Sequence, residues 1–213
     1  MKQSTLKHLD EFFGRYTQTE YLRGAIEQAV QCIVSLPQAN KVLVCGNGGS
    51  AADAEHISGE MLKGFLLKRP VKQDLRQKLA QAYADGEFIA DNLQEGIKCI
   101  PLTSLTSAST AFLNDCNDKL LYAQLVNALA VQGDILIAIS TSGNSANVVY
   151  AAKIAKVLGV KIIALTGAKG GKLKDIADVL INVPSDETYR IQEYHLPVYH
   201  LICMCAESEL FDF

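Results

Sequence analysis

The sequence predicts an α/β fold with a doubly wound, five-stranded parallel sheet flanked by helices, and with further helices at the amino terminus. Three observations predict it. Short apolar runs alternate with segments of helical periodicity. The runs are apolar along their whole length, as in strands that are buried on both faces. Several of them end in glycine, serine or threonine, which is typical of strands that lead into ligand-binding loops.

The first 38 residues are expected to form helices. Two apolar stripes with helical spacing support this, the first made of Leu6, Leu9, Phe12, Phe13 and Tyr16, the second of Leu22, Ile26, Val30 and Ile33. Pro37 ends this helical run, because proline cannot continue a helix.

Five strands are expected in the rest of the chain, at residues 41–45, 97–102, 134–139, 160–165 and 179–183. Helices are predicted to begin at Ala51, to run from Ala146 to Leu158, and to close the chain from Tyr189 to Phe211. With right-handed crossovers, this order gives a flavodoxin-like or Rossmann-like fold. One domain is expected to cover residues 1–213.

Residues 67–98 break the alternation of strands and helices. Apolar residues at steps of four, separated by charged and polar ones, predict an amphipathic helix or a helical hairpin: Leu67, Val71, Leu75, Leu79 and Tyr83. We expect this insertion to be an oligomer contact or a solvated flap rather than part of a substrate site.

The composition excludes several classes of function. The formal net charge is -3 and no stretch is rich in lysine and arginine, so we expect no nucleic-acid partner. No segment resembles a signal peptide or a membrane span, and the six cysteines include no C-x-x-C pair. A cytosolic protein with reduced thiols and no membrane partner is expected.

Two loops at predicted strand ends suit a phosphate group. Gly46-Asn-Gly-Gly-Ser50 and Ser140-Thr-Ser-Gly-Asn-Ser145 combine glycines, hydroxyl groups and a following helix N-terminus. Residues 46–51 also match a loose dinucleotide fingerprint, but the next predicted strand does not end in the acidic residue that would hold a ribose. The ATPase loop motif is absent from the sequence. We therefore expect a phosphate monoester and no nucleotide cofactor.

Ionisable residues lie near these loops in the sequence. His56 and Glu60 are four residues apart and share a helix face. Gln192, His195 and His200 lie on the predicted last helix. Taken singly, each histidine reads as a surface or packing residue; a carboxylate and imidazoles beside phosphate loops indicate proton transfer.

Four motifs resemble the SIS (sugar isomerase) domain family, and more narrowly the phosphoheptose isomerases. They are residues 46–56, 139–147, 165–171 and 190–193, in the family's order. The resemblance implies an isomerase that interconverts ketose and aldose phosphates, most simply sedoheptulose 7-phosphate and D-glycero-D-manno-heptose 7-phosphate. It also implies a homotetramer, a dimer of dimers, with sites between subunits.

The resemblance assigns roles residue by residue. Glu60 matches the general base, and His200 matches its acid/base partner, which usually comes from across a subunit boundary. Members that bind zinc use residues matching His56, Glu60, Gln192 and His200, so one zinc per site is compatible with this sequence. Substrate and phosphate contacts match Asn47, Gly48, Gly49, Ser50, Asp115, Ser140, Thr141, Ser142, Ser145 and Gln192.

The sequence also departs from the family pattern. Gly64 stands where the family often has arginine, with Lys63, Lys68 and Arg69 as substitutes; Tyr189 replaces a common aspartate; and Pro197 interrupts the last helix. Two alternatives therefore stay open, an isomerase for a different phosphosugar and a non-catalytic regulatory protein of the type associated with replication initiators. A sugar-phosphate-sensing or etherase-type SIS protein fits the motif at residues 190–193 and His200 less well.

Overall fold

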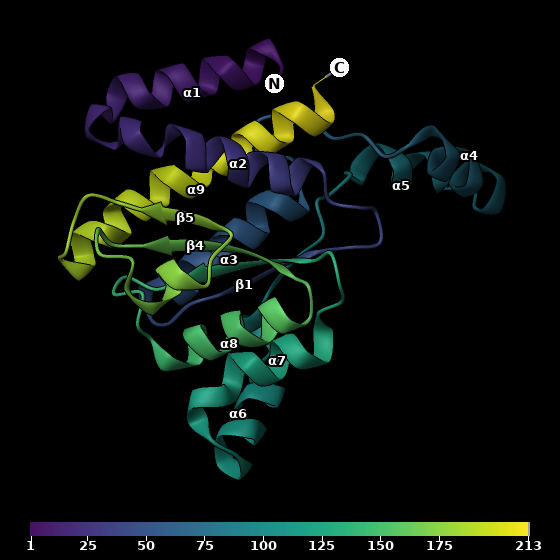
Figure 1. Cartoon of the computed structure of the whole chain (residues 1–213). Coiled ribbons are helices and arrows are strands. Elements are labelled where there is room, and N and C mark those ends of the chain that lie inside the picture. The colour runs from purple at the N-terminus through teal and green to yellow at the C-terminus, as the bar shows by residue number, and fades with distance from the viewer. Residues whose placement is uncertain (213) are drawn as a thin grey trace.

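The computed structural model describes residues 1–212 and contains one sheet of parallel strands (Figure 1). The order across this sheet is β2-β1-β3-β4-β5, which is the flavodoxin-like arrangement. The strands are β1 (Val42–Cys45), β2 (Cys99–Pro101), β3 (Ile135–Ile139), β4 (Lys161–Thr166) and β5 (Val179–Asn182). The predicted fold class and strand number are confirmed, although β2 is shorter than the expected 97–102.

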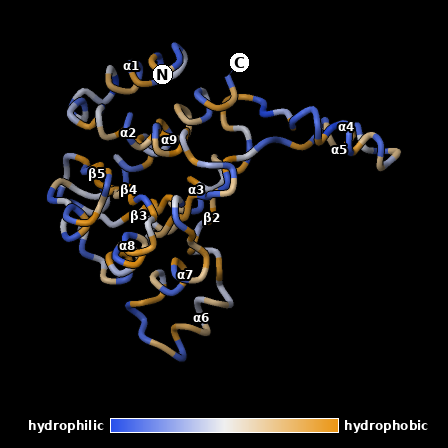
Figure 2. Tube along the Cα trace, turned by 45° about the vertical axis from the view of Figure 1, so that its right-hand side comes forward, coloured by the Kyte–Doolittle hydropathy of each residue, from blue (hydrophilic) through white to orange (hydrophobic). Residues whose placement is uncertain are grey.

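Two helical layers cover the sheet because successive strand residues point to opposite faces. Val42 and Val44 of β1 pack into one core with α1 (Gln3–Arg15), α2 (Arg23–Val34), α3 (Gly49–Leu62) and α9 (Thr188–Phe211). Leu43 and Cys45 pack into a second core with α7 (Leu121–Leu129) and α8 (Ala146–Val157). Figure 2 shows the apolar strands enclosed between these layers.

The amino-terminal helices form as predicted, with a 3-10 turn between them. This turn, η1, spans Thr17–Leu22, so the expected helical run divides into α1 and α2. Both helices pack against α9, and Leu9, Phe13 and Ile26 are buried. The long last helix therefore lies between the amino-terminal helices and the site described below.

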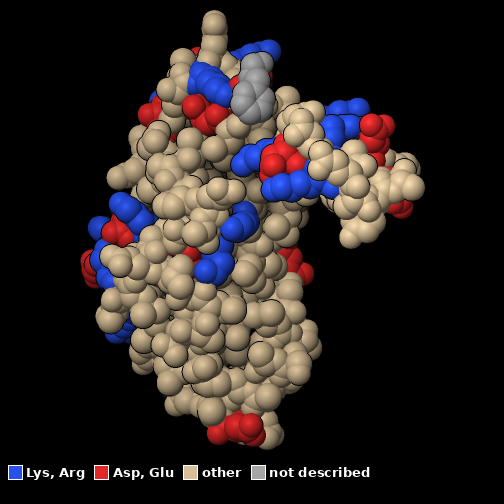
Figure 3. Space-filling view, turned by 90° about the vertical axis from the view of Figure 1, so that its right-hand side faces the viewer, with Lys and Arg blue, Asp and Glu red and all other residues tan. Residues whose placement is uncertain are grey.

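Residues 67–98 form a projecting arm, which we define as α4 (Gln73–Ala82), α5 (Gly86–Asn92) and their connections (Figure 1). The two helices make a hairpin, and α4 buries none of its residues. The prediction of a continuous stripe from Leu67 was wrong at its start, because Leu67 and Val71 precede α4. Figure 3 shows charged side chains of both signs on this arm.

Two local features differ from their sequence patterns. The segment from Thr103 to Thr110, whose many hydroxyl groups are typical of a loop, is helical, since it falls in η2 (Leu102–Ser104) and α6 (Thr106–Asp115). Helix α9 continues through Pro197 instead of being interrupted there. The last helix is thus one rigid element that carries Gln192, His200 and Glu207.

Two short 3-10 segments complete the description of the chain, η3 (Asp118–Leu120) and η4 (Gly171–Asp175).

None of the helices within residues 1–212 is long and apolar enough to cross a bilayer. The six cysteines are free thiols, four of them buried. Burial raises the pKa of the Cys45 thiol to about 12, so it packs as a small apolar side chain.

Candidate active site

The loop after β1 turns sharply into α3. Gly48 has a φ of 56°, a left-handed conformation that favours glycine, and helix α3 begins at Gly49, two residues earlier than expected. Ser50 is buried. The loop therefore presents backbone N–H groups and the positive end of the α3 dipole at the edge of the sheet.

The loop after β3 lies beside it. Asn47 and Asn147 exchange two amide hydrogen bonds, of 2.9 and 2.8 Å, which tie the β1 loop to the start of α8. In the β3 loop the Ser140 hydroxyl donates to Ser145 Oγ at 3.0 Å, and the Asn144 backbone N–H donates to Ser142 Oγ. The structure thus brings together the two loops that the sequence assigned to phosphate.

Helices α3 and α9 run side by side in the same direction. Gln192 lies against Gly49, where a Cβ atom would come within 2.5 Å of the Gln192 amide nitrogen. Further along, the His200 ring packs against the His56 ring with centroids 4.8 Å apart. Seven residues of α3 and eight of α9 therefore separate the loop end of this helix pair from its histidine end.

Glu60, His56 and His200 form a cluster at that far end. His56 Nε2 lies 3.2 Å from Glu60 Oε1 and 3.4 Å from His200 Nε2. Glu60 Oε2 is buried without a hydrogen bond, and Lys63 Nζ lies 3.6 Å from it. Burial and the neighbouring His56 lower the pKa of His200, so its ring is neutral at neutral pH. A carboxylate oxygen without a hydrogen bond, in a cluster that also holds the His200 ring, can accept a proton.

His200 meets the cluster of its own chain. The resemblance implied a histidine supplied across a subunit boundary, which stays a prediction. Within this chain, His56 contacts both Glu60 and His200. The reason lies in the parallel packing of α3 and α9, which are far apart in sequence but adjacent in the fold.

Tyr199 and Asp53 belong to the cluster and were not predicted. The Tyr199 hydroxyl lies 2.9 Å from His56 Nδ1, so it fixes the orientation of that ring. Burial, together with the nearby Asp53 carboxylate, raises the pKa of Tyr199. Asp53 precedes His56 by three residues, so helical spacing could have suggested it. Tyr199 is the immediate neighbour of His200, and no helical spacing points to it.

Asp115 is the predicted site residue that the structure leaves apart. It is exposed at the end of α6, where the adjacent Asn114 Nδ2 donates to its Oδ1 at 2.8 Å. Helix α6 extends away from the sheet (Figure 1). Nothing among the described residues joins Asp115 to the loops or to Glu60.

The four expected zinc ligands do not form one ligand shell in this arrangement. Gln192 rests on Gly49, seven helical residues from His56. Among residues 1–212, no three His, Cys, Asp or Glu side chains are grouped so as to hold a metal ion. Of the four residues, only His56, Glu60 and His200 lie close together. His56 Nε2 is 3.2 Å from Glu60 Oε1 and 3.4 Å from His200 Nε2, which resembles the spacing of ligand atoms around a tetrahedral ion.

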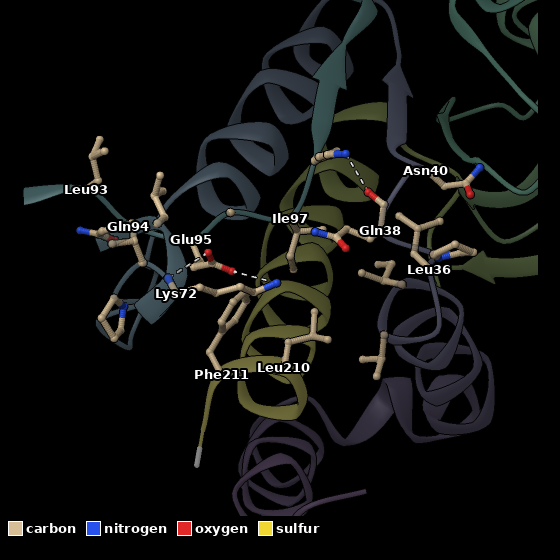
Figure 4. A pocket seen from close by; sticks show the side chains of 18 of the residues that line it. Leu36, Gln38, Asn40, Lys72, Leu93, Gln94, Glu95, Ile97, Leu210 and Phe211 are labelled. Carbon is tan, nitrogen blue, oxygen red and sulfur yellow. Dashed lines mark hydrogen bonds and ion pairs between the residues drawn. The ribbon is translucent and has the colours of Figure 1, made fainter. Parts of the chain in front are cut away.

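A groove of about 490 Å³ opens beside the cluster. It runs between α1 and α9, and His200, Leu66 and Met204 line it. A separate cavity of about 770 Å³ lies at the base of the arm, between α2 and the end of α9 (Figure 4). Its walls include Leu36, Ile97 and Phe211 but no residue of the loops or the cluster, so it is not the candidate active site.

Comparison with known proteins assigns the family. A model of the SIS domain matches residues 9–92 and 93–167. The phosphoheptose isomerase of Aliarcobacter butzleri is 41% identical over 192 residues, which make up 90% of this chain and 88% of that protein. The chain belongs to the phosphoheptose isomerase family.

Solved structures of the family share the fold described above. The phosphoheptose isomerase of Neisseria gonorrhoeae is 36% identical with a TM-score of 0.72, and covers 95% of this chain and 96% of its own. That of Francisella tularensis is 30% identical with a TM-score of 0.74, and covers 97% of this chain and 100% of its own. The match spans the arm as well as the sheet.

The structure also explains why this phosphoheptose isomerase family member has glycine at position 64. A Cβ atom there would collide with the Leu67 carbonyl oxygen and lie 2.6 Å from Gln94 Oε1, so an arginine has no room. Of the three basic substitutes, Lys63 reaches Glu60, Lys68 is exposed, and Arg69 is buried. Arg69 is therefore unavailable to a substrate.

Proposed function

We propose that this chain isomerises a ketose phosphate to an aldose phosphate, with sedoheptulose 7-phosphate as substrate. One observation carries the proposal. The Glu60 carboxylate, one oxygen of which is buried without a hydrogen bond, lies in a cluster with His56 and His200, one helix segment away from the paired glycine and serine loops. A proton-transfer group at one end and a phosphate cradle at the other suit a phosphorylated sugar.

The spacing supports a long sugar. At a rise of about 1.5 Å per residue, the seven residues from Gly49 to His56 span roughly 10 Å. An extended chain advances roughly 1.2 Å per bond, judging from backbone dimensions. The phosphorus atom of an open-chain heptose 7-phosphate lies eight bonds from C1, so such a substrate reaches from the loops to His56, whose Nε2 lies 3.2 Å from Glu60 Oε1.

The proposed phosphate contacts need no basic residue. Backbone N–H groups at the starts of α3 and α8, with the hydroxyl groups of Ser50, Thr141, Ser142 and Ser145, would donate hydrogen bonds to the phosphate oxygens. Gly48 and Gly49 let the backbone approach closely. Asn47, Ser140 and Gln192 lie around this proposed phosphate site, through the hydrogen bonds and the contact described above.

The proposed chemistry moves two protons. The Glu60 carboxylate takes a proton from C1 of the ketose, which gives an enediolate, and returns it to C2. Neutral His200 transfers a proton between O1 and O2, so the carbonyl group moves from C2 to C1. Tyr199 holds His56 in place between the two residues. Atoms and charge balance without an external acid or oxidant.

The family resemblance also allows one zinc ion per site, and its role is tested separately from the proton transfers. His56, Glu60 and His200 supply suitable donor atoms, whereas Gln192 would have to leave Gly49 to join them. The proton transfers above therefore use side chains alone. Turnover by metal-stripped protein, measured with and without added zinc, tests whether these residues act as ligands.

The decisive experiment removes the base. We expect Glu60→Gln to lower kcat on sedoheptulose 7-phosphate by about 10²- to 10⁴-fold, because general base catalysis contributes that much. Glu55→Gln is the matched control, since Glu55 lies on the same helix and is exposed, hydrogen-bonded to Thr103. Full activity of Glu60→Gln, with the fold intact by circular dichroism, would refute the mechanism.

We also propose a homo-oligomer in a reducing compartment. Exposed apolar side chains on the arm support a contact with another copy: Leu75, Tyr83, Phe88 and Leu93. Six free cysteines, four of them buried, suit a cytosolic protein. Because His56 contacts both Glu60 and His200 of its own chain, we expect one subunit to contain both proposed catalytic groups.

A further inference from the structure

A buried ion pair lies directly beneath the proposed catalytic cluster. Arg69 Nε lies 2.7 Å from Glu207 Oε1, and both side chains are almost completely buried, at 0% and 1% exposed. Two charges removed from water are unfavourable unless further hydrogen bonds satisfy them. Arg69 and Glu207 each make such further hydrogen bonds, and the groups that they bind show which segments the pair holds in place.

Arg69 binds the end of the helix that carries the proposed base. Its Nη1 donates to the Met61 carbonyl oxygen at 2.7 Å, and its Nη2 donates to the Glu60 carbonyl oxygen at 3.1 Å. Helix α3 ends at Leu62, so these carbonyl groups belong to its last turn, which lacks helical partners. A cation there also complements the negative end of the helix dipole. The guanidinium thus fixes the backbone at Glu60 itself.

Glu207 holds the segment that packs on the other catalytic group. Its Oε1 accepts from the Phe65 backbone N–H at 2.7 Å, and its Oε2 accepts from Leu66 and Leu67 at 2.7 and 3.1 Å. The Phe65 ring lies 5.4 Å, centroid to centroid, from the His200 ring. Glu207 also stands two helical turns after His200 on α9. The pair therefore contacts the supports of both Glu60 and His200.

We propose that Arg69 and Glu207 are positioning residues that hold the Glu60 carboxylate in register with His200 for proton transfer. This inference rests on the proposed isomerase function. Misplacement of a reacting group by about 1 Å can lower a rate about a hundredfold. The pair acts through the backbone of Glu60 and through Phe65, and touches no substrate.

The test separates positioning from stability. Arg69→Lys keeps a positive charge for Glu207 but cannot donate to the carbonyl oxygens of both Glu60 and Met61. The double variant Arg69→Met, Glu207→Gln removes both charges and keeps an acceptor for the backbone N–H groups of residues 65–67. The matched control is Lys41→Met with Asp134→Asn. That pair is also shielded, with Lys41 Nζ 2.6 Å from Asp134 Oδ2, but lies at the amino ends of β1 and β3.

We expect both Arg69 variants, folded by circular dichroism at the assay temperature, to lose at least about tenfold in kcat with KM nearly unchanged. The Lys41 and Asp134 double variant should keep wild-type kcat even if it melts earlier. Folded Arg69 variants whose kcat stays within about twofold of wild type would overturn the proposal.

A second readout does not depend on turnover. The ring-proton NMR resonances of His56, whose Nε2 lies 3.2 Å from Glu60, report where that carboxylate stands. They should move in Arg69→Lys toward their positions in Glu60→Gln, and stay in place in the Lys41 and Asp134 control. Wild-type protein without turnover would refute the proposed function, and unmoved His56 resonances would refute the positioning role.

Discussion

The arm and the catalytic corner, which we define as the packed ends of α3 and α9, use the same kinds of charged residue in opposite surroundings. On the arm, Lys78 and Asp74 pair at 2.7 Å while 70% and 75% exposed. In the corner, Arg69 and Glu207 pair at the same distance with no exposure above 1%. Water and the loss of side-chain entropy weaken an exposed ion pair. When one member of a buried pair is removed, no water can solvate the charge that remains. The difference teaches that burial, and not the pairing itself, decides what an ion pair does.

The sharpest way to break this comparison is to remove the buried acid. We expect Glu207→Ala to lower the free energy of unfolding by about 3–5 kcal/mol, because it leaves the Arg69 charge and the backbone N–H groups of residues 65–67 unpaired. Chemical denaturation of wild type and variant measures this. A loss below about 1 kcal/mol, the range of exposed pairs, would show that burial does not distinguish the two regions.

A smaller effect on the free energy of unfolding is expected from pH, through the buried His195 on α9. Burial lowers the pKa of His195 from 6.5 to about 4, while its contact with the Thr166 carbonyl oxygen opposes the shift. The unfolded chain then binds a proton more tightly than the folded one. The resulting stabilisation is complete above pH 6.5 and is lost as the pH falls toward 4, by about 3 kcal/mol at most.

The measurement is the free energy of unfolding as a function of pH for wild type and His195→Gln. The difference between the two curves should be constant above pH 6.5 and should shrink steadily between pH 6.5 and 4. Parallel curves across that window would contradict the assignment of a neutral, buried His195.

The smallest effect is expected on the arm. Asp91→Ala removes the partner of Arg76, where the two side chains are 61% and 33% exposed, and should change the free energy of unfolding far less than Glu207→Ala does. The same denaturation assay measures it, and added salt should shrink the wild-type contribution further. A loss of several kcal/mol would mean that the arm is buried in the functional assembly.

Much of the architecture could be predicted because local signals agree with the fold. Continuous apolar runs such as residues 42–45 and 135–139 can satisfy burial on both faces only inside a parallel sheet. Glycine and serine after such runs mark loops, and the two loops indeed meet at one edge of the sheet, where Asn47 is hydrogen-bonded to Asn147. His56 and Glu60 were predictable as a pair because helical spacing places them on one face.

Other features depended on contacts between distant segments. Thr103 to Thr110 has the composition of a loop, but the chain there forms helical turns. Leu67 and Val71 fit a helical stripe, yet this segment is drawn to α9, where Glu207 accepts the backbone N–H groups of residues 65–67. Local periodicity could not report that competition, because the acceptor lies some 140 residues away.

The sequence by itself determined the sheet, the loops and the chemical nature of the catalytic candidates, since hydrophobic pattern and turn residues act locally. Only the tertiary structure decided that His200 contacts His56 of its own chain, that Tyr199 fixes the His56 ring, and that Gly64 leaves no room for arginine. It also turned Arg69 from a candidate substrate contact into a buried support of Glu60. The reason is that side-chain partners in a packed core are set by which helices lie together, and no local pattern encodes that.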